Sequence, residues 1–180
     1  MLKILSERFS GRSYLSSQQV SKTQMQLILE AGRCAPSCYN EQPWYFLVCD
    51  REKDSEGYEK ILSSLAEGNK AWASSAPVLL VSIAGSKFTK SGKPNRWGPY
   101  DTGAAALSMM LEATALGLMA HQMGGFDEHM ISQKFNIPSE FTPIAVMAIG
   151  YESPEEKHTP KDRKPMEVNF YSGTWGNSWK

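Results

Sequence analysis

The segment from Asp101 to about Leu118 constrains the fold most, because a helix over these residues is apolar on nearly every side. Its alanine, leucine and methionine side chains leave no polar stripe of the kind that a surface helix shows. Such a helix is buried on most sides, either in a core or against another subunit. A chain of 20.0 kDa has little material to cover it alone. We therefore expect an oligomer.

Other helices are predicted from their caps and from apolar spacing. Residues 21–24 form a capping box, and Gly32 and Pro36 end the helix that follows it. Residues 50–75 are interpreted as polar helix and loop with an apolar stripe. Asp127 is expected to cap a short helix.

Three apolar, β-branched runs predict strands, with polar connections between them. The strands are expected at residues 44–49, 77–84 and 143–150. Residues 85–100 carry four Lys or Arg and no apolar period, so an exposed loop is expected there. These strands are too few for a doubly wound fold. The sequence therefore predicts one α+β domain over residues 1–180, a modest sheet covered by helices.

Composition and missing motifs exclude several classes of function. The 19 Lys and Arg cancel the 19 Asp and Glu, so no overall basic field attracts nucleic acid. The most apolar long run, 102–120, contains Glu112, so no membrane span is predicted. The glycine fingerprints of dinucleotide and phosphate-loop folds are absent, as are G-x-S-x-G and H-E-x-x-H. His121 and His129 are poorly spaced for a metal, and no metal site is expected.

The three cysteines do not form a disulfide framework, which favours a reducing cytoplasm. Cys34 and Cys38 lie four residues apart across Pro36. They are interpreted either as small packed residues or as a reactive thiol pair.

Three separated segments are suited to a planar anionic ligand. Residues 8–12 place two arginines around a serine, which suits a phosphate. Residues 35–44 hold Ser, Asn and Gln between prolines, which suits the edge of a heterocycle. Residues 121–127 contain two glycines before a helix, where backbone N–H groups can approach a ligand. Taken singly, these segments could equally be a solvated basic terminus and two ordinary turns, and the basic residues 161–164 could be a solvated surface.

Together these segments resemble the nitroreductase family of flavoproteins. Five blocks occur in the family's order and span about residues 3–170. The matching positions are Arg8, Ser10 and Arg12; Ala35, Pro36, Ser37, Asn40, Gln42, Pro43 and Trp44; Tyr100, Asp101, Gly103, Ala105, Leu116, Gly117 and Leu118; Ile149, Gly150 and Tyr151; Lys161, Arg163, Pro165, Met166 and Glu167.

The resemblance implies that FMN binds non-covalently at the interface of an intertwined α+β homodimer with a central antiparallel or mixed sheet. Its phosphate would be held from both ends of the chain, and the other subunit would supply contacts to the isoalloxazine ring. The cofactor-binding residues implied are Arg8, Phe9, Ser10, Arg12, Pro36, Ser37, Cys38, Asn40, Met123, Gly124, Gly125, Lys161 and Arg163. Phe9 and Cys38 depart from the Arg or His and the Ser that are common in the family.

The implied activity is hydride transfer from NAD(P)H through flavin N5 to nitroaromatic, quinone or similar acceptors by a ping-pong mechanism, with no catalytic side chain. The departures at Phe9 and Cys38 leave open a flavin-binding or redox-sensing protein with little turnover. A redox protein based on Cys34 and Cys38 is a third hypothesis. Residues 151–180 are expected to be an extension that packs on the partner subunit, because two tryptophans lie in this polar tail.

Overall fold

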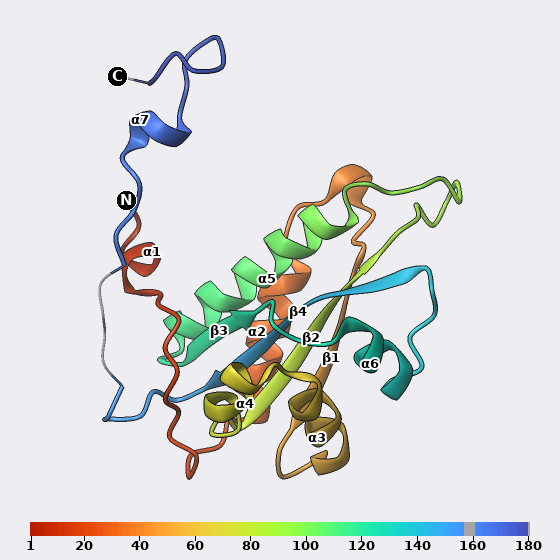
Figure 1. Ribbon diagram of the computed structural model, residues 1–180, viewed down its shortest axis with the longest axis vertical. Helices are drawn as coiled ribbons and strands as arrows, with labels where there is room; N and C mark the ends of the chain where they lie inside the picture. The colour runs from red at the N-terminus through yellow and green to blue at the C-terminus, as the bar shows by residue number, and fades with distance from the viewer. Residues whose placement is uncertain (157–160, 180) are drawn as a thin grey trace.

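The computed structural model describes residues 1–156 and 161–179, and a four-stranded antiparallel sheet forms its centre (Figure 1). The strand order is β1-β2-β4-β3. The strands are β1 (Trp44–Asp50), β2 (Val78–Gly85), β3 (Met119–Met123) and β4 (Phe141–Gly150). The predicted α+β class is therefore confirmed.

Helices cover both faces of this sheet and make three layers. One face packs against α2 (Lys22–Arg33) and α5 (Gly98–Ala115). The other packs against α3 (Ser55–Ser64), α4 (Glu67–Ala73) and α6 (Glu128–Lys134). Two short helices, α1 (Lys3–Glu7) and α7 (Met166–Asn169), lie near the ends of the chain. None of the helices in the described residues is long and apolar enough to cross a lipid bilayer.

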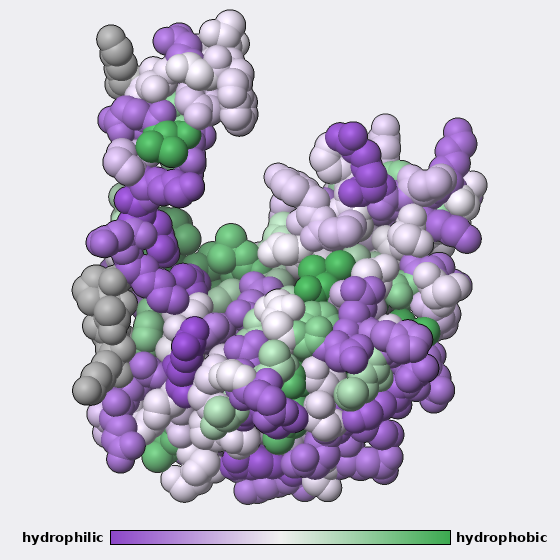
Figure 2. Space-filling view, in the orientation of Figure 1, coloured by the Kyte–Doolittle hydropathy of each residue, from purple (hydrophilic) through white to green (hydrophobic). Residues whose placement is uncertain are grey.

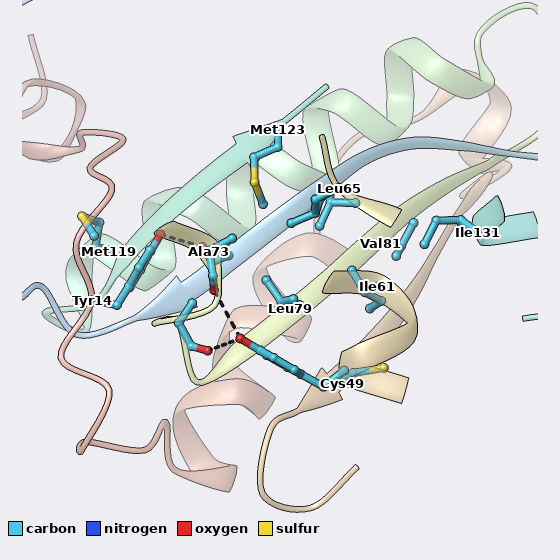
Figure 3. Close-up of a cluster of buried hydrophobic side chains, with 14 of the residues drawn as sticks. Tyr14, Cys49, Ile61, Leu65, Ala73, Leu79, Val81, Met119, Met123 and Ile131 are labelled. Atoms are coloured by element: carbon cyan, nitrogen blue, oxygen red, sulfur yellow. Dashed lines mark hydrogen bonds between the residues drawn. The ribbon is translucent and has the colours of Figure 1, made fainter. Parts of the chain in front are cut away.

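Side chains of β2 alternate between the two cores, as strand geometry requires. Val78 and Leu80 join the core of α2 and α5, whereas Leu79 and Val81 join the opposite core (Figure 3). Because β2 is paired on both sides and covered on both faces, its sequence is continuously apolar. Burying each such side chain contributes roughly 1.5–3 kcal/mol to folding.

Two predicted helix starts are confirmed by their side-chain caps. Ser21 and Gln24 form the reciprocal capping box at the start of α2. The carboxylate of Asp127 accepts a hydrogen bond from the backbone N–H of Met130, at 2.8 Å, at the start of α6.

Both predicted ends of the long apolar helix are wrong by three residues. The helix α5 begins at Gly98, and Asp101 is buried within its first turn instead of capping it. It ends at Ala115 because Gly117 adopts φ +74°. The N–H groups of Gly117 and Leu118 then bond to the carbonyls of Thr114 and Ala113, which is a Schellman motif.

The chain turns at Gly117 directly into β3, a strand that the sequence did not predict. Its five residues include His121 and Gln122, which hid the strand pattern. The predicted loop 85–100 is also shorter in the structure, because Gly85 belongs to β2 and residues 98–100 belong to α5.

The helix α5 is buried on one face only within a single chain. Its buried side chains pack against β2, β3 and α2, and include Ala105, Ala106, Met109 and Met110. On its other face Tyr100 is 74% exposed and Leu107 is 46% exposed. Residues 161–179, here called the C-terminal arm, extend away from the body beyond α1 (Figure 1).

Candidate functional site

A cleft of about 810 Å³ brings the two ends of the chain together. Arg8, Phe9 and Ser10 line it from the segment after α1, and Lys161 and Arg163 line it from the C-terminal arm. The other lining residues are Met1, Leu5, Ser6, Glu7 and Thr114. The residues that the resemblance places at the phosphate, Arg8, Ser10, Lys161 and Arg163, therefore lie around one opening, whereas Arg12 does not line it.

The charges in this cleft suit an anion. Glu7 is the one carboxylate among its lining residues, and Lys3 Nζ pairs with it at 2.9 Å. The guanidinium of Arg8 donates a hydrogen bond from Nη1 to Ser10 Oγ at 3.1 Å. Cation and hydroxyl are thus held side by side, and a phosphate can accept from both.

The backbone at Gly11 is fixed by two groups from distant parts of the chain. His121 on β3 donates from Nδ1 to the Gly11 carbonyl at 2.8 Å. The carboxylate of Glu156 accepts from the N–H groups of Arg12 and Ser13, both at 2.5 Å. A Cβ atom at Gly11 would lie 2.4 Å from Met119 Sδ, so a larger residue here would have to displace neighbouring side chains. These contacts attach the backbone of residues 8–12 to β3 and so determine where the side chains of this segment lie.

His121 is half-buried and stacks on the indole of Trp72, with ring centroids 4.6 Å apart. Burial lowers the pKa of its imidazole, while the bond to the Gly11 carbonyl acts in the opposite direction. The cations of Arg12 and Lys161 lower the pKa further, and Glu156 raises it. Burial thus favours the neutral ring, and a proton on Nδ1 allows that ring to donate to the Gly11 carbonyl.

The second predicted segment is strained. Tyr39, Asn40 and Gln42 all have positive φ, between 52° and 57°, although none is glycine. Such residues cost of order 1–3 kcal/mol each and concentrate at ligand sites. Ser37 Oγ accepts from the Gln42 N–H at 3.0 Å and closes the turn. Tyr39, at the tip of this turn, is 92% exposed.

Asp101 anchors this strained turn to α5. Its Oδ2 accepts from the Cys38 N–H at 3.0 Å, and its negative charge is favourable in the first turn of a helix. Thr114, in the last turn of α5, lines the Arg8 cleft. At 1.5 Å of rise per residue, the two sites lie about 20 Å apart along one helix. A single chain therefore does not bring Ser37 and Asn40 to the cleft.

The third predicted segment follows the edge strand. Met123 ends β3 and is buried, while Gly124 is exposed with open space where a Cβ would be. The Gly125 carbonyl accepts from Ala66 N–H at 2.9 Å and from Asn69 Nδ2 at 3.0 Å. The edge strand thus runs from the Gly11 loop, which His121 contacts, to this exposed backbone.

The cysteines are free thiols, and the helix α2 ends before Pro36 as predicted. Cys34 is exposed near the Glu30 carboxylate, with Sγ to Oε1 at 3.8 Å, and Cys38 is half-buried. Among the described residues, no group of three or more His, Cys, Asp or Glu side chains could hold a metal ion.

Sequence reasoning missed three residues that shape the site. His121 was assigned to a turn, Asp101 to a cap, and Glu156 received no role. The Glu156 carboxylate accepts a hydrogen bond from the backbone N–H of Arg12, which is 144 positions earlier in the chain. A contact between such distant residues cannot be predicted from a local sequence pattern. The glycine at position 11, between Ser10 and Arg12, is the local feature that indicates close packing of the backbone there.

The chain is similar to known proteins in both sequence and structure. The profile of the Nitroreductase family matches residues 5–151. A protein of Archaeoglobus fulgidus, provisionally named an NADH dehydrogenase/NAD(P)H nitroreductase, is 30% identical over 91% of this chain and 87% of its own length. A Bacillus subtilis protein, provisionally named an NAD(P)H nitroreductase, is 28% identical over 83% of this chain and 87% of its own. A crystal structure described as that of an oxidoreductase containing FMN has a TM-score of 0.90 and 30% identity, and the match covers 99% of this chain and 94% of that one.

The contact between His121 and Gly11 predicts a pH-dependent stability. The unfolded imidazole takes up a proton below about pH 6.5, whereas the folded protein resists it because burial lowers the pKa. The free energy of unfolding should therefore fall as the pH falls through about 6.5. In a His121→Asn variant this component is absent, so urea unfolding of the two proteins should differ more at neutral than at acidic pH. A difference that stays constant with pH would contradict this assignment.

Proposed function

The chain belongs to the nitroreductase family, and on that premise we propose that it is an FMN-dependent oxidoreductase, which uses NAD(P)H to reduce nitroaromatic, quinone or similar acceptors. The observation that carries the proposal is the cleft at which Arg8 and Ser10 meet Lys161 and Arg163. Two segments more than 150 positions apart converge there.

The donors of this cleft fit the phosphate of FMN. Three cations and a hydroxyl face an opening whose one carboxylate, Glu7, is already paired with Lys3. A charge-assisted hydrogen bond contributes roughly 1.5–3 kcal/mol. Three such bonds suffice for micromolar binding after the costs of association are subtracted.

In this proposal the flavin ring lies between two subunits. The separation of about 20 Å along α5 means that Ser37 and Asn40 would come from the partner. Phe9 and Arg12 would border the ring from the same chain as the phosphate site, with Arg12 at the pyrimidine edge. Pro36 and Cys38 lie in the strained turn, and Met123, Gly124 and Gly125 would present backbone toward N5.

The protein supplies position and charge to the reaction. Bound FMN would provide the hydride chemistry, accepting from NAD(P)H and donating to an acceptor on the same face, which gives a ping-pong order. The Arg12 cation would stabilise negative charge that develops at the pyrimidine edge. The exposed Gly124 leaves room beside the ring for a flat substrate. No side chain is required as an acid or base.

Two unpartnered apolar surfaces support a homodimer as part of the proposal. The first is the exposed face of α5 with Tyr100 and Leu107. The second is the C-terminal arm, on which large apolar side chains are exposed, namely Met166, Val168, Phe170, Trp175 and Trp179. Figure 2 shows hydrophobic atoms in the angle between the arm and the body. A second copy would cover both, with residues 151–180 as the extension that packs on it.

The three free cysteines fit a reducing cytoplasm, which we include in the proposal. The strained turn is held by Asp101 and Ser37 rather than by a thiol. A Cys34→Ser/Cys38→Ser variant is therefore expected to keep its activity.

Purified protein should be yellow, or become so with added FMN, and should oxidise NADH or NADPH repeatedly with a nitroaromatic or a quinone. Absorbance spectra and steady-state kinetics measure both properties. A protein that stays colourless in excess FMN would refute the proposal. Flavin binding with only a single turnover would favour the sensing hypothesis instead.

Replacement of Arg8 with alanine should weaken FMN binding by at least about tenfold, because a charge-assisted bond to the phosphate is lost. Fluorescence titration measures the affinity. Lys22→Ala is the control, since Lys22 is an exposed cation on α2 that does not line the cleft. An unchanged affinity for Arg8→Ala would mean that the phosphate lies elsewhere.

A Leu107→Glu variant should lower the population of dimers, because it places a charge on the apolar face of α5. Light scattering should give a mass near 40 kDa for the unmodified protein, twice that of the 20.0 kDa chain. Lys22→Glu, at an exposed position on α2, is a surface control. A monodisperse species of one chain in the unmodified protein would contradict the dimer.

A further inference from the structure

The connection between β2 and α5, residues 86–97, carries a local excess of positive charge, although the formal net charge of the whole chain is zero. It contains Lys87, Lys90, Lys93 and Arg96 and has no acidic residue. All four cations are exposed, and none forms an ion pair within the described part of the chain. Figure 1 shows this connection, here called the basic loop, projecting beside the start of α5.

The backbone of the basic loop is organised by its own hydrogen bonds. Phe88 N–H bonds to the Lys93 carbonyl at 2.9 Å, and Gly92, with φ +68°, closes the tip through a bond to the Phe88 carbonyl at 2.8 Å. At its base, Asn95 N–H bonds to the Ser86 carbonyl at 2.7 Å, and the Asn95 side chain is buried. The cations are therefore presented on a defined hairpin.

The basic loop is attached to the strained turn that the proposed function assigns to the flavin ring. Glu41 accepts hydrogen bonds from the N–H and the hydroxyl of Thr89, the former at 2.6 Å. Tyr39 and Phe88 meet edge to face, with centroids 6.1 Å apart. Glu41 is the carboxylate of the turn, and these contacts hold it to the loop backbone. The cations thus border the place where a co-substrate would approach the ring.

Flat aromatic surfaces lie beside the same charges. Arg96 stacks over Trp97 at 4.3 Å, and Trp97 meets Tyr100 edge to face at 6.1 Å. Tyr39, in the strained turn, is largely exposed. Exposed rings can stack on a nucleobase, and lysine ammonium groups bind phosphate as point charges. This combination suits a ligand with both an adenine ring and a phosphate outside the reacting group.

We propose that the basic loop binds the adenosine 2′-phosphate of NADPH, so that NADPH is the preferred reductant. The inference rests on the proposed function, since it concerns the dinucleotide that would reduce the flavin. NADH has the same adenine and pyrophosphate but lacks the 2′-phosphate. The negative charge of the 2′-phosphate is therefore the feature by which four cations outside any described ion pair can distinguish NADPH from NADH.

The kinetic test compares both nicotinamides at a fixed acceptor. In a Lys90→Gln/Lys93→Gln variant, kcat/KM for NADPH should fall about tenfold, the loss expected when charge-assisted contacts are removed, while kcat/KM for NADH should change less than about twofold. Lys90→Arg/Lys93→Arg should retain the preference for NADPH. Lys22→Gln, at the far end of α2, should change neither value.

A binding test separates this inference from the proposed function. Calorimetric titration with 2′,5′-ADP and with 5′-AMP requires no turnover. Tighter binding of 2′,5′-ADP than of 5′-AMP, lost in the Lys90→Gln/Lys93→Gln variant, would support the loop even in a preparation that fails to oxidise either nicotinamide. Equal binding of the two nucleotides, equal losses for NADPH and NADH, or a change in the acceptor KM alone would overturn it.

Discussion

The packing of α5 against the sheet determines how the rest of the site is arranged. On one face of this helix, Ala105, Ala106 and Met109 are buried against the core, and this packing fixes the helix axis relative to β2 and β3. Its first turn then holds the strained turn through Asp101, and its last turn borders the Arg8 cleft through Thr114. A rigid helix keeps these two groups about 20 Å apart. The same residues that stabilise the core therefore separate the two parts of the site within one chain.

This separation makes the proposed dimer a requirement of the proposed chemistry. A flavin bound at Arg8 reaches the Ser37 turn only if a second chain supplies it. The exposed face of α5 and the C-terminal arm both have apolar side chains available for that contact. The arm also carries Lys161 and Arg163 into the Arg8 cleft, so folding of the arm and binding of an anion are coupled in this proposal.

The starts of two helices were predictable because they depend on local chemistry. Ser21 and Asp127 cap helices within their own turns, and such contacts follow directly from the sequence. Strand β3 was missed because His121 and Gln122 interrupt its apolar pattern, and because one of its faces binds the Gly11 loop instead of solvent. The early start of α5 was missed because Gly98 and Pro99 are typical of turns, although proline is well suited to the first turn of a helix.

The sequence alone determined the α+β class, the positions of the central strands and the residue types suited to an anionic, planar ligand, because these follow from periodicity, caps and charge within short windows. Tertiary structure alone decided that His121 and Glu156 fix the Gly11 backbone and that Asp101 holds the Cys38 turn. Each of these contacts joins residues more than 60 positions apart. Their distances depend on how helices and strands pack, and packing is a property of the whole core rather than of any segment.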